Sequence, residues 1–292
     1  KEIFIIKILS HLSQNLSVES FDVILTSSYN LFSFVQRPIP RKELCIYLMN
    51  LSKKNEFFLP LAEMIRDLNS LNSKYPEEPD YDCRISAFNK INNYIDSIFE
   101  NPTKLSSTQL KFIDLLLLNC AFFLNTFDDL SIRESSSAVI MKITLLFRIH
   151  PLTDLYNKYV IDMILLKIIP DGIRNPKESA SIEFIGILVD IIRTPSSSSS
   201  SSSLNNIYID QLLSLCNNDD EELDFWQNIR HIQLHRRARA LNRLLQNKSL
   251  LESLSSCVYS NFLIPIVENQ IIYSSSSSGG GQQTNVGLFN TS

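Results

Sequence analysis

Two histidines four residues apart, His231 and His235, have the spacing of a metal-binding pair. On a helix, side chains at this spacing project from the same side, as in the H-E-x-x-H motif of zinc proteases. That motif also needs a glutamate directly after the first histidine as the general base, and this sequence has Ile232 there. No third ligand is evident nearby, although zinc sites use three or four ligands. We therefore do not expect this histidine pair to bind a metal ion, and we expect no cofactor.

Arginines crowd into the same stretch of the sequence. Residues 225–248 carry no acidic side chain and six basic ones, namely Arg230, Arg236, Arg237, Arg239, Arg243 and Lys248. Arg236, Arg239 and Arg243 are spaced i, i+3 and i+7, which places them on one stripe of a helix, and His235 lies beside them. Guanidinium groups bind phosphates bidentately. We therefore predict that these four side chains contact RNA phosphates or an acidic partner.

A structural role for the arginines is the alternative interpretation. The acids of 219–224 lie at the start of the expected helix and the arginines toward its end, which the helix dipole favours. Charge-lined helices are also commonly solvated faces. Helical-repeat arrays bury arginine–aspartate contacts between repeats, and Arg230 and Arg237 lie near the apolar face of this helix. We assign repeat packing to Arg230, Arg237, Trp226, Leu234 and Leu241.

Apolar residues recur at helical spacing along almost the whole chain, and we find no convincing strand pattern. In residues 21–35 they advance in steps of three, four or seven, and the segment stops before Pro38 and Pro40. The chain has only six glycines, which disfavours tight hairpins and phosphate-cradling loops. The pattern predicts helices near 1–15, 18–36, 41–54, 57–72, 83–99, 107–125, 131–149, 152–169, 176–193, 204–216, 220–247 and 249–270.

The expected helices pair at a regular interval. Their pairs begin near residues 1, 41, 83, 131, 176 and 220, so the interval stays in the forties. A helical hairpin that repeats every ~40–47 residues is the period of HEAT or armadillo arrays, in which each hairpin buries one face on its neighbours. We predict an all-α, HEAT/armadillo-like α-solenoid of about six helical hairpins. An irregular helical domain is the alternative.

Two serine-rich segments divide the chain. We expect helical repeats over 1–193, a disordered insertion over 194–203, helical repeats with the arginine-rich segment over 204–272, and a disordered tail over 273–292. The five cysteines are far apart, which is typical of reduced thiols in an intracellular protein. The apolar run at 115–124 is too short to span a bilayer. The net charge of −4 lacks the basic excess of a dedicated nucleic-acid-binding domain.

Sequence motifs of common enzymes are missing. No G-x-x-x-x-G-K-[ST], G-x-G-x-x-G or G-x-S-x-G occurs, so nucleotide-binding loops and hydrolase elbows have no support. His11 and His150 stand alone, and no pair of carboxylates stands out as an acid–base couple. We therefore expect no catalytic residues and no small-molecule substrate. An enzyme would need histidines and carboxylates that converge from different helices.

A longer signature surrounds the arginines. Asp224 to Leu241 follows the pattern D-F-[FW]-x-N-I-x-H-I-Q-x-H-R-R-A-R-A-L, with Trp226 where Phe is expected, and a helix with the internal Pro265 follows. In this pattern residues 212–250 closely resemble the down-regulated-in-metastasis family, very large HEAT-repeat scaffold proteins associated with U3 small nucleolar RNA. Members of that family are several times longer than this chain, so we expect a fragment.

The resemblance implies a non-enzymatic HEAT-repeat scaffold of ribosome biogenesis in the nucleolus, within the nucleus. It implies a part of the small-subunit processome, a preribosome in which the family supports processing of the small-subunit rRNA precursor. The implied partners are pre-ribosomal proteins and pre-rRNA or small nucleolar RNA, and no membrane. A protein-only HEAT adaptor with no direct RNA contact is the alternative.

Overall fold

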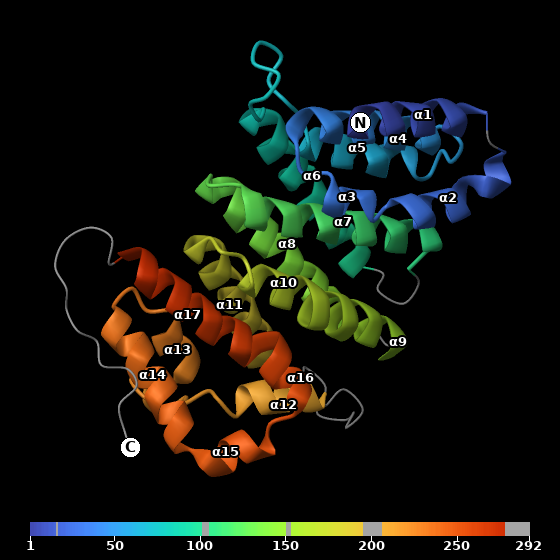
Figure 1. The fold of residues 1–292 in the computed structure, drawn as a ribbon. Helices are drawn as coiled ribbons and strands as arrows, with labels where there is room; N and C mark the ends of the chain where they lie inside the picture. Colours follow the sequence, from blue (N-terminus) through green and yellow to red (C-terminus); the bar gives the residue numbers. More distant parts are fainter. Residues whose placement is uncertain (16, 101–104, 150–152, 195–205, 278–292) are drawn as a thin grey trace. The chain divides into compact units, whose positions relative to one another are not determined.

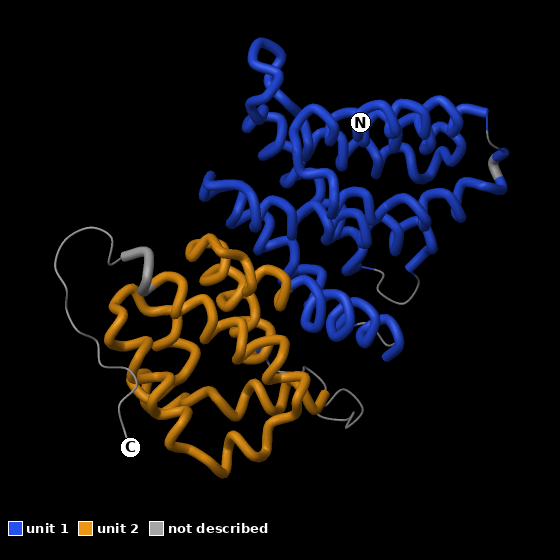
Figure 2. Tube along the Cα trace, viewed as in Figure 1, with its two compact units in different colours: residues 1–168, 194–204 blue, residues 169–193, 205–292 orange. Residues whose placement is uncertain are grey.

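The computed structural model describes residues 1–292 except 16, 101–104, 150–152, 195–205 and 278–292. Within the described residues the chain is mostly helical and forms no strand, only an isolated antiparallel bridge between Leu71 and Pro79. The predicted all-α class is confirmed. The chain divides into two compact units (Figure 2): unit 1 is Lys1–Ile168 with Thr194–Leu204, and unit 2 is Ile169–Arg193 with Asn205–Ser292.

Unit 1 is a succession of helices that pack on one another (Figure 1). Its elements are α1 (Glu2–Gln14), the short 3-10 helix η1 (Val18–Ser20), α2 (Phe21–Ser28), α3 (Leu31–Phe34), α4 (Pro38–Ser52), α5 (Leu59–Leu68), α6 (Tyr81–Phe99), α7 (Ser107–Thr126), α8 (Leu130–Ile149), α9 (Thr153–Tyr156) and the π-helix η2 (Asn157–Ile168).

Unit 2 begins directly after η2 and is also helical. Its elements are α10 (Ile169–Ile173), α11 (Glu178–Arg193), α12 (Ile207–Leu213), α13 (Phe225–Ile229), α14 (Leu234–Gln246), α15 (Lys248–Ser253), α16 (Ser256–Val258), the π-helix η3 (Tyr259–Leu263) and α17 (Ile264–Ser277). The internal Pro265 follows η3, and a π-helical turn is one of the ways in which a helix accommodates a proline.

The division between the units differs from the expected domain boundaries. It falls between Ile168 and Ile169, at the end of an expected helix, and not at the serine-rich stretch. Residues 195–203 of that stretch and residues 278–292 of the expected tail lie outside the described residues. The first part of the expected tail, residues 273–277, is the end of α17.

Neighbouring helices in unit 1 pack in chain order, as in a helical-repeat array. α4 packs on α5, α5 on α6, and α7 on α8. The expected pairing of the first two helices is different, because α1 packs mainly on α4. The expected helix 18–36 is broken into η1, α2 and α3.

Local hydrogen bonds give a physical reason for that break. At the end of α2, the hydroxyls of Thr26, Ser27 and Ser28 each donate to the backbone carbonyl four residues earlier, at 2.7, 2.8 and 2.7 Å. Such bonds compete with the helix's own hydrogen bonds and often bend it. Three such bonds in succession lie in the last turn of α2, which ends at Ser28.

α7 is the core helix of unit 1. It begins with a capping box, in which the Ser106 hydroxyl accepts from the Gln109 backbone and the Gln109 side chain accepts from the Ser106 backbone. The helix is longer than the apolar run within it, and by length and composition it could cross a membrane. However, 67% of its most apolar window is buried inside the unit, as in the core helix of a compact helical fold.

Two glycines in unit 2 give a matched pair of stability predictions. A Cβ on Gly172 of α10 would overlap the ring of Phe184, which is fully buried on α11, whereas a Cβ on Gly186 would lie 3.6 Å from the Arg230 guanidinium, an ordinary contact. Overpacking a core costs ~1–3 kcal/mol. We expect Gly172→Ala to lower the free energy of unfolding of unit 2 by that amount, and Gly186→Ala, in the interior of α11, to raise it by ~0.5–1 kcal/mol.

The readout is the fluorescence of Trp226, the one tryptophan of the chain, which is buried in unit 2 and so reports on that unit. Equal urea midpoints for Gly172→Ala and the parent chain would contradict the close approach of α10 to Phe184.

Candidate functional site

The segment expected as one helix over 220–247 is broken in the structure. α13 ends at Ile229 and α14 starts at Leu234, with Gln233 as its extended N-cap (φ −82°, ψ 118°). His231 therefore lies in the turn between the helices, where its Nδ1 accepts from the Gln233 backbone N–H at 3.0 Å. The premise that His231 and His235 share one helical face is wrong. Among the residues that the structure describes, no group of three or more side chains could hold a metal ion.

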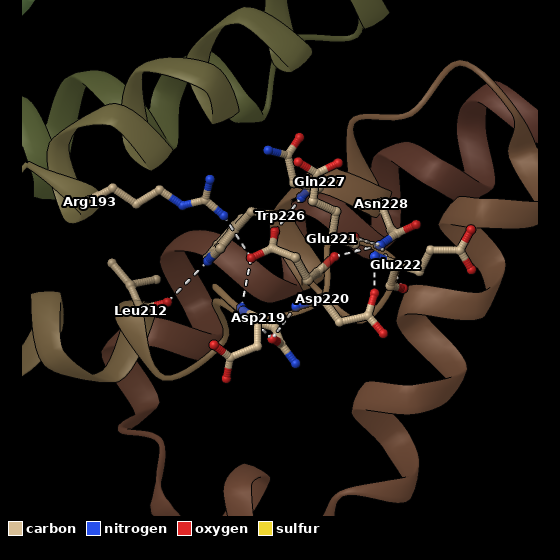
Figure 3. Close-up of polar contacts among 11 residues, drawn as sticks. Arg193, Leu212, Asp219, Asp220, Glu221, Glu222, Trp226, Gln227 and Asn228 are labelled. Atoms are coloured by element: carbon tan, nitrogen blue, oxygen red, sulfur yellow. Dashed lines mark hydrogen bonds and ion pairs between the residues drawn. The ribbon is translucent and has the colours of Figure 1, made fainter.

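Asp224 is the centre of the signature's first half, and Figure 3 labels two of its partners, Arg193 and Gln227. Its carboxylate is fully buried and accepts three hydrogen bonds: from the backbone of Gln227 at 2.7 Å, from the backbone of Asn217 at 2.8 Å, and from Arg193 Nη2 at 2.7 Å. The first bond caps α13, the second closes the 217–224 loop, and the third ties that loop to the end of α11. One carboxylate thus fixes three parts of unit 2.

Asn228 and Trp226, both in α13, donate further hydrogen bonds to the same region (Figure 3). The Asn228 amide donates to the carbonyls of Glu221, Glu222 and Asp224, at 3.0, 3.0 and 2.7 Å. The Trp226 indole is fully buried and donates from Nε1 to the Leu212 carbonyl at 3.0 Å. These bonds satisfy backbone carbonyls of the 217–224 loop and of α12, so the Asp-Phe-Trp-x-Asn part of the signature acts on the fold.

Arg237 is the buried arginine of α14, with 3% exposure. Its Nη1 pairs with Glu178, the first residue of α11, at 2.5 Å, and contacts Gln270 of α17 at 3.4 Å. Its Nε donates to the His231 carbonyl at 2.5 Å. The side chain therefore joins α14 to two other helices and to the turn before it.

Arg236 and Arg243, two members of the predicted stripe, are bound to the acidic loop of their own chain. Arg236 Nη2 lies 3.3 Å from a Glu222 carboxylate oxygen, and Arg243 Nη1 donates to the Glu222 backbone carbonyl. The Arg236 side chain is 24% exposed. These contacts lay the loop along α14, so two of the three stripe arginines already have a partner inside unit 2.

Arg239 and His235 differ from their neighbours because both are exposed. Neither has a hydrogen bond or an ion pair with another residue in the described part of the chain. The structure therefore leaves them as the outward-facing members of the predicted contact set.

Burial and the positive charge of the nearby Arg236 lower the pKa of His231, in the turn, below its usual value.

The residues expected to pack the repeat fall into two groups. Trp226 and Arg237 are buried, and Arg230 is half-buried with its guanidinium against Gly186 of α11. Leu234 is 48% exposed, so the expectation that it packs inside the array is not met within unit 2, and Leu241 is half-buried. The reason is the turn at 230–233, which starts α14 later and changes which side chains face the unit.

Sequence reasoning missed Asp224 and Arg193 as organising residues. A signal for Asp224 was present, because an aspartate followed three residues later by a glutamine, here Gln227, is an N-terminal helix signature. Arg193 carries no comparable signal, since its partner lies 31 residues away.

Comparison with known proteins shows the family to which the chain belongs. Residues 1–177 match the family model described as "U3 small nucleolar RNA-associated protein 20, N-terminal". The chain belongs to this family. This match covers the part in which the sequence alone offered no motif, whereas the arginine signature lies beyond it.

Two curated relatives carry the name U3 small nucleolar RNA-associated protein 20. The one from Saccharomyces cerevisiae is 27% identical over 262 residues, 88% of this chain and 10% of its own length. The one from Schizosaccharomyces pombe is 31% identical over 209 residues, 70% of this chain and 8% of its own length. The chain therefore spans about a tenth of the length of these relatives.

Proposed function

We propose that this chain is a segment of a U3 small nucleolar RNA-associated factor and acts as a non-catalytic helical scaffold in ribosome biogenesis. In this role it supports assembly of the small-subunit processome in the nucleolus and processing of the small-subunit rRNA precursor. The observation that carries the proposal is family membership, together with the name that both relatives share.

The contacts of the signature support a scaffold over an enzyme. The polar side chains of Asp224, Asn228 and Arg237 hold loops and helices of unit 2 together. Catalytic groups instead need to converge where a substrate can reach them. The signature thus stabilises unit 2, and we expect partner molecules to bind the side chains that unit 2 exposes.

The association with U3 can be tested on the full-length protein in cells. Affinity purification of the tagged protein is expected to enrich U3 small nucleolar RNA over an unrelated small nucleolar RNA, and its depletion is expected to raise the level of uncleaved small-subunit rRNA precursor. Without U3 enrichment or precursor accumulation, the proposal fails.

Within this function, we assign the partner contact to Arg239 and His235. Guanidinium groups are weakly hydrated and bind phosphate or carboxylate oxygens, and Arg239 is exposed and without a partner in the described chain. The contacts of Arg236 and Arg243 with Glu222 favour the second candidate function, a protein-only adaptor whose arginines serve its own fold.

Salt dependence separates these two functions. If Arg239 meets an RNA phosphate, Arg239→Ala lowers the slope of log affinity against log salt by about one, with no change in unfolding. We expect this result for binding of the chain to a precursor rRNA fragment. Glu221→Ala, an exposed change beside Glu222, serves as the control for altered surface charge. An unchanged slope for Arg239→Ala would favour the protein-only adaptor.

A further inference from the structure

Unit 1 contains a buried arginine that no carboxylate accompanies. Arg41 of α4 is 3% exposed. Its Nε donates to the Asn69 side-chain oxygen at 2.5 Å and its Nη2 to that of Asn119 at 2.6 Å, while Nη1 donates to the carbonyls of Phe32 and Val35 at 2.8 and 2.9 Å. All of these acceptors are neutral. They accept from all three nitrogens of Arg41 but leave its charge without a counter-ion.

A second arginine, Arg84 of α6, lies close by and is also 3% exposed. Its Nε donates to the Ser70 carbonyl at 3.1 Å, and its guanidinium lies 4.8 Å from the centre of the Phe127 ring. Its Nη1 is buried and has no hydrogen-bond partner. A buried polar group without a partner is rare in native proteins and calls for an explanation, such as a ligand.

Arg41 and Arg84 both line one cavity of about 270 Å³, far larger than the space that a single water molecule needs. The loop at 71–80 and the α7 residues Phe122 and Thr126 form its walls. Arg41 also stacks on Phe122, at 3.6 Å from the ring centre. The cavity thus combines apolar walls with two cationic groups.

Acidic groups close to this cavity form no ion pair with the two arginines, although the charge of Asp80 raises the pKa of Arg84 in part against the effect of burial. Glu77 is the one acid among the described lining residues, and it is exposed. Asp80 caps α6 by accepting from the Cys83 backbone at 3.0 Å. No ion pair joins either guanidinium to a carboxylate within the described residues of unit 1.

Two positive charges in a low-dielectric site raise the free energy of the fold unless a negative charge accompanies them. Burial, with a smaller contribution from the charge of Arg84, lowers the pKa of Arg41 to about 9, and burial lowers the pKa of Arg84 to about 10. Both groups remain protonated at neutral pH. Aromatic rings and carbonyl dipoles offset part of this cost, and a bound anion would offset the rest.

We propose that this cavity binds one tetrahedral oxyanion with about two negative charges, as inorganic phosphate or as the terminal phosphate of a phosphomonoester. The charge selects the ligand: two guanidinium groups without an ion-pair partner match a phosphomonoester, which carries about −1.5 to −2 at pH 7, better than a carboxylate or an internal phosphodiester with one charge each. The free N–H groups at Arg84 Nη1 are the donors that remain for it. The proposal does not depend on the role in ribosome biogenesis.

The test is thermal unfolding of the 292-residue chain with inorganic phosphate against chloride at equal ionic strength. We expect phosphate to raise the unfolding temperature by several degrees at a hundredfold excess over the dissociation constant. Arg84→Met is expected to weaken phosphate binding at least ~10-fold, because it removes the unpaired donors. Arg66→Met is the control, since Arg66 is an exposed arginine of α5 paired with Asp67 and does not line the cavity.

Folding of the Arg84→Met variant is itself informative. Because the substitution removes an uncompensated buried charge, we expect this variant to unfold at the same temperature as the parent chain or higher in phosphate-free buffer. A large fall in that temperature would show that the contacts of Arg84 with Ser70 and Phe127 outweigh the cost of its buried charge, and it would overturn the proposal.

Glu77→Gln gives an independent test on the surface. Removing this negative charge from the cavity lining is expected to tighten phosphate binding ~2- to 5-fold. No phosphate-specific stabilisation of the parent chain, or equal stabilisation of Arg84→Met, would overturn the proposal. So would displacement of phosphate by an RNA oligonucleotide with hydroxyl ends, because that would make the site one for backbone phosphodiesters.

Discussion

Asp224→Asn is expected to lower the free energy of unfolding of unit 2 by about 3 kcal/mol. The substitution keeps the shape of the side chain but removes the charge that holds Arg193, and an amide nitrogen would face N–H donors of Asn217 or Gln227 where a carboxylate oxygen now accepts. The site is fully buried on the Asp224 side, so water does not replace the lost bonds.

The measurement for Asp224→Asn is urea unfolding followed by the fluorescence of Trp226, two residues away. Asp219→Asn is the matched control, because Asp219 lies in the same loop, is exposed, and accepts no hydrogen bond with its side chain in the described structure. Exposed substitutions of this kind change stability by at most ~0.5 kcal/mol. Equal losses for the two variants would contradict the role of Asp224.

Arg237→Met is expected to cost ~2–3 kcal/mol, a value at the lower end for a buried pair because its partner Glu178 is 43% exposed. Methionine fills much of the same volume, so the loss comes from the bonds to Glu178, to the His231 carbonyl and to Gln270. We expect the turn at 230–233 to loosen along with α14.

A double-mutant cycle with Glu178→Gln isolates the ion pair of Arg237. The loss of stability in the double variant is expected to be smaller than the sum of the two single losses by ~1 kcal/mol or more, since residues in direct contact are not additive. Additive losses would show that the two side chains stabilise unit 2 independently and would contradict their pairing.

The sequence closely predicted the bounds of those helices of unit 1 that bury an apolar face. The expected helices 107–125 and 131–149 correspond to α7 (Ser107–Thr126) and α8 (Leu130–Ile149). Their periodicity arises from one apolar face or an apolar core, which is a local property of the sequence. The break in the expected helix 18–36 was not predicted, because hydroxyl bonds to the backbone do not disturb the apolar pattern.

In the arginine segment, local sequence patterns are not sufficient to predict the structure. Its apolar and charged periodicity runs through 230–233, yet the chain turns there, because Arg237 binds the His231 carbonyl and Glu178, a residue 59 positions away. Glu222 was expected in the first turn of a helix. In the loop it occupies instead, it folds back onto Arg236 and Arg243, which no spacing rule predicts. The buried position of Arg237, in contrast, follows from its place beside the apolar face.

The arginines of the signature divide into Arg236, Arg237 and Arg243, which bind other parts of unit 2, and Arg239, which faces outward. The most direct test of this division is the urea unfolding of Arg237→Met and Arg239→Met side by side, followed by Trp226 fluorescence. We expect a loss of ~2–3 kcal/mol for Arg237→Met and a change within ~0.5 kcal/mol for Arg239→Met. Equal stabilities of the two variants, or a greater loss for Arg239→Met, would show that the arginines do not divide in this way.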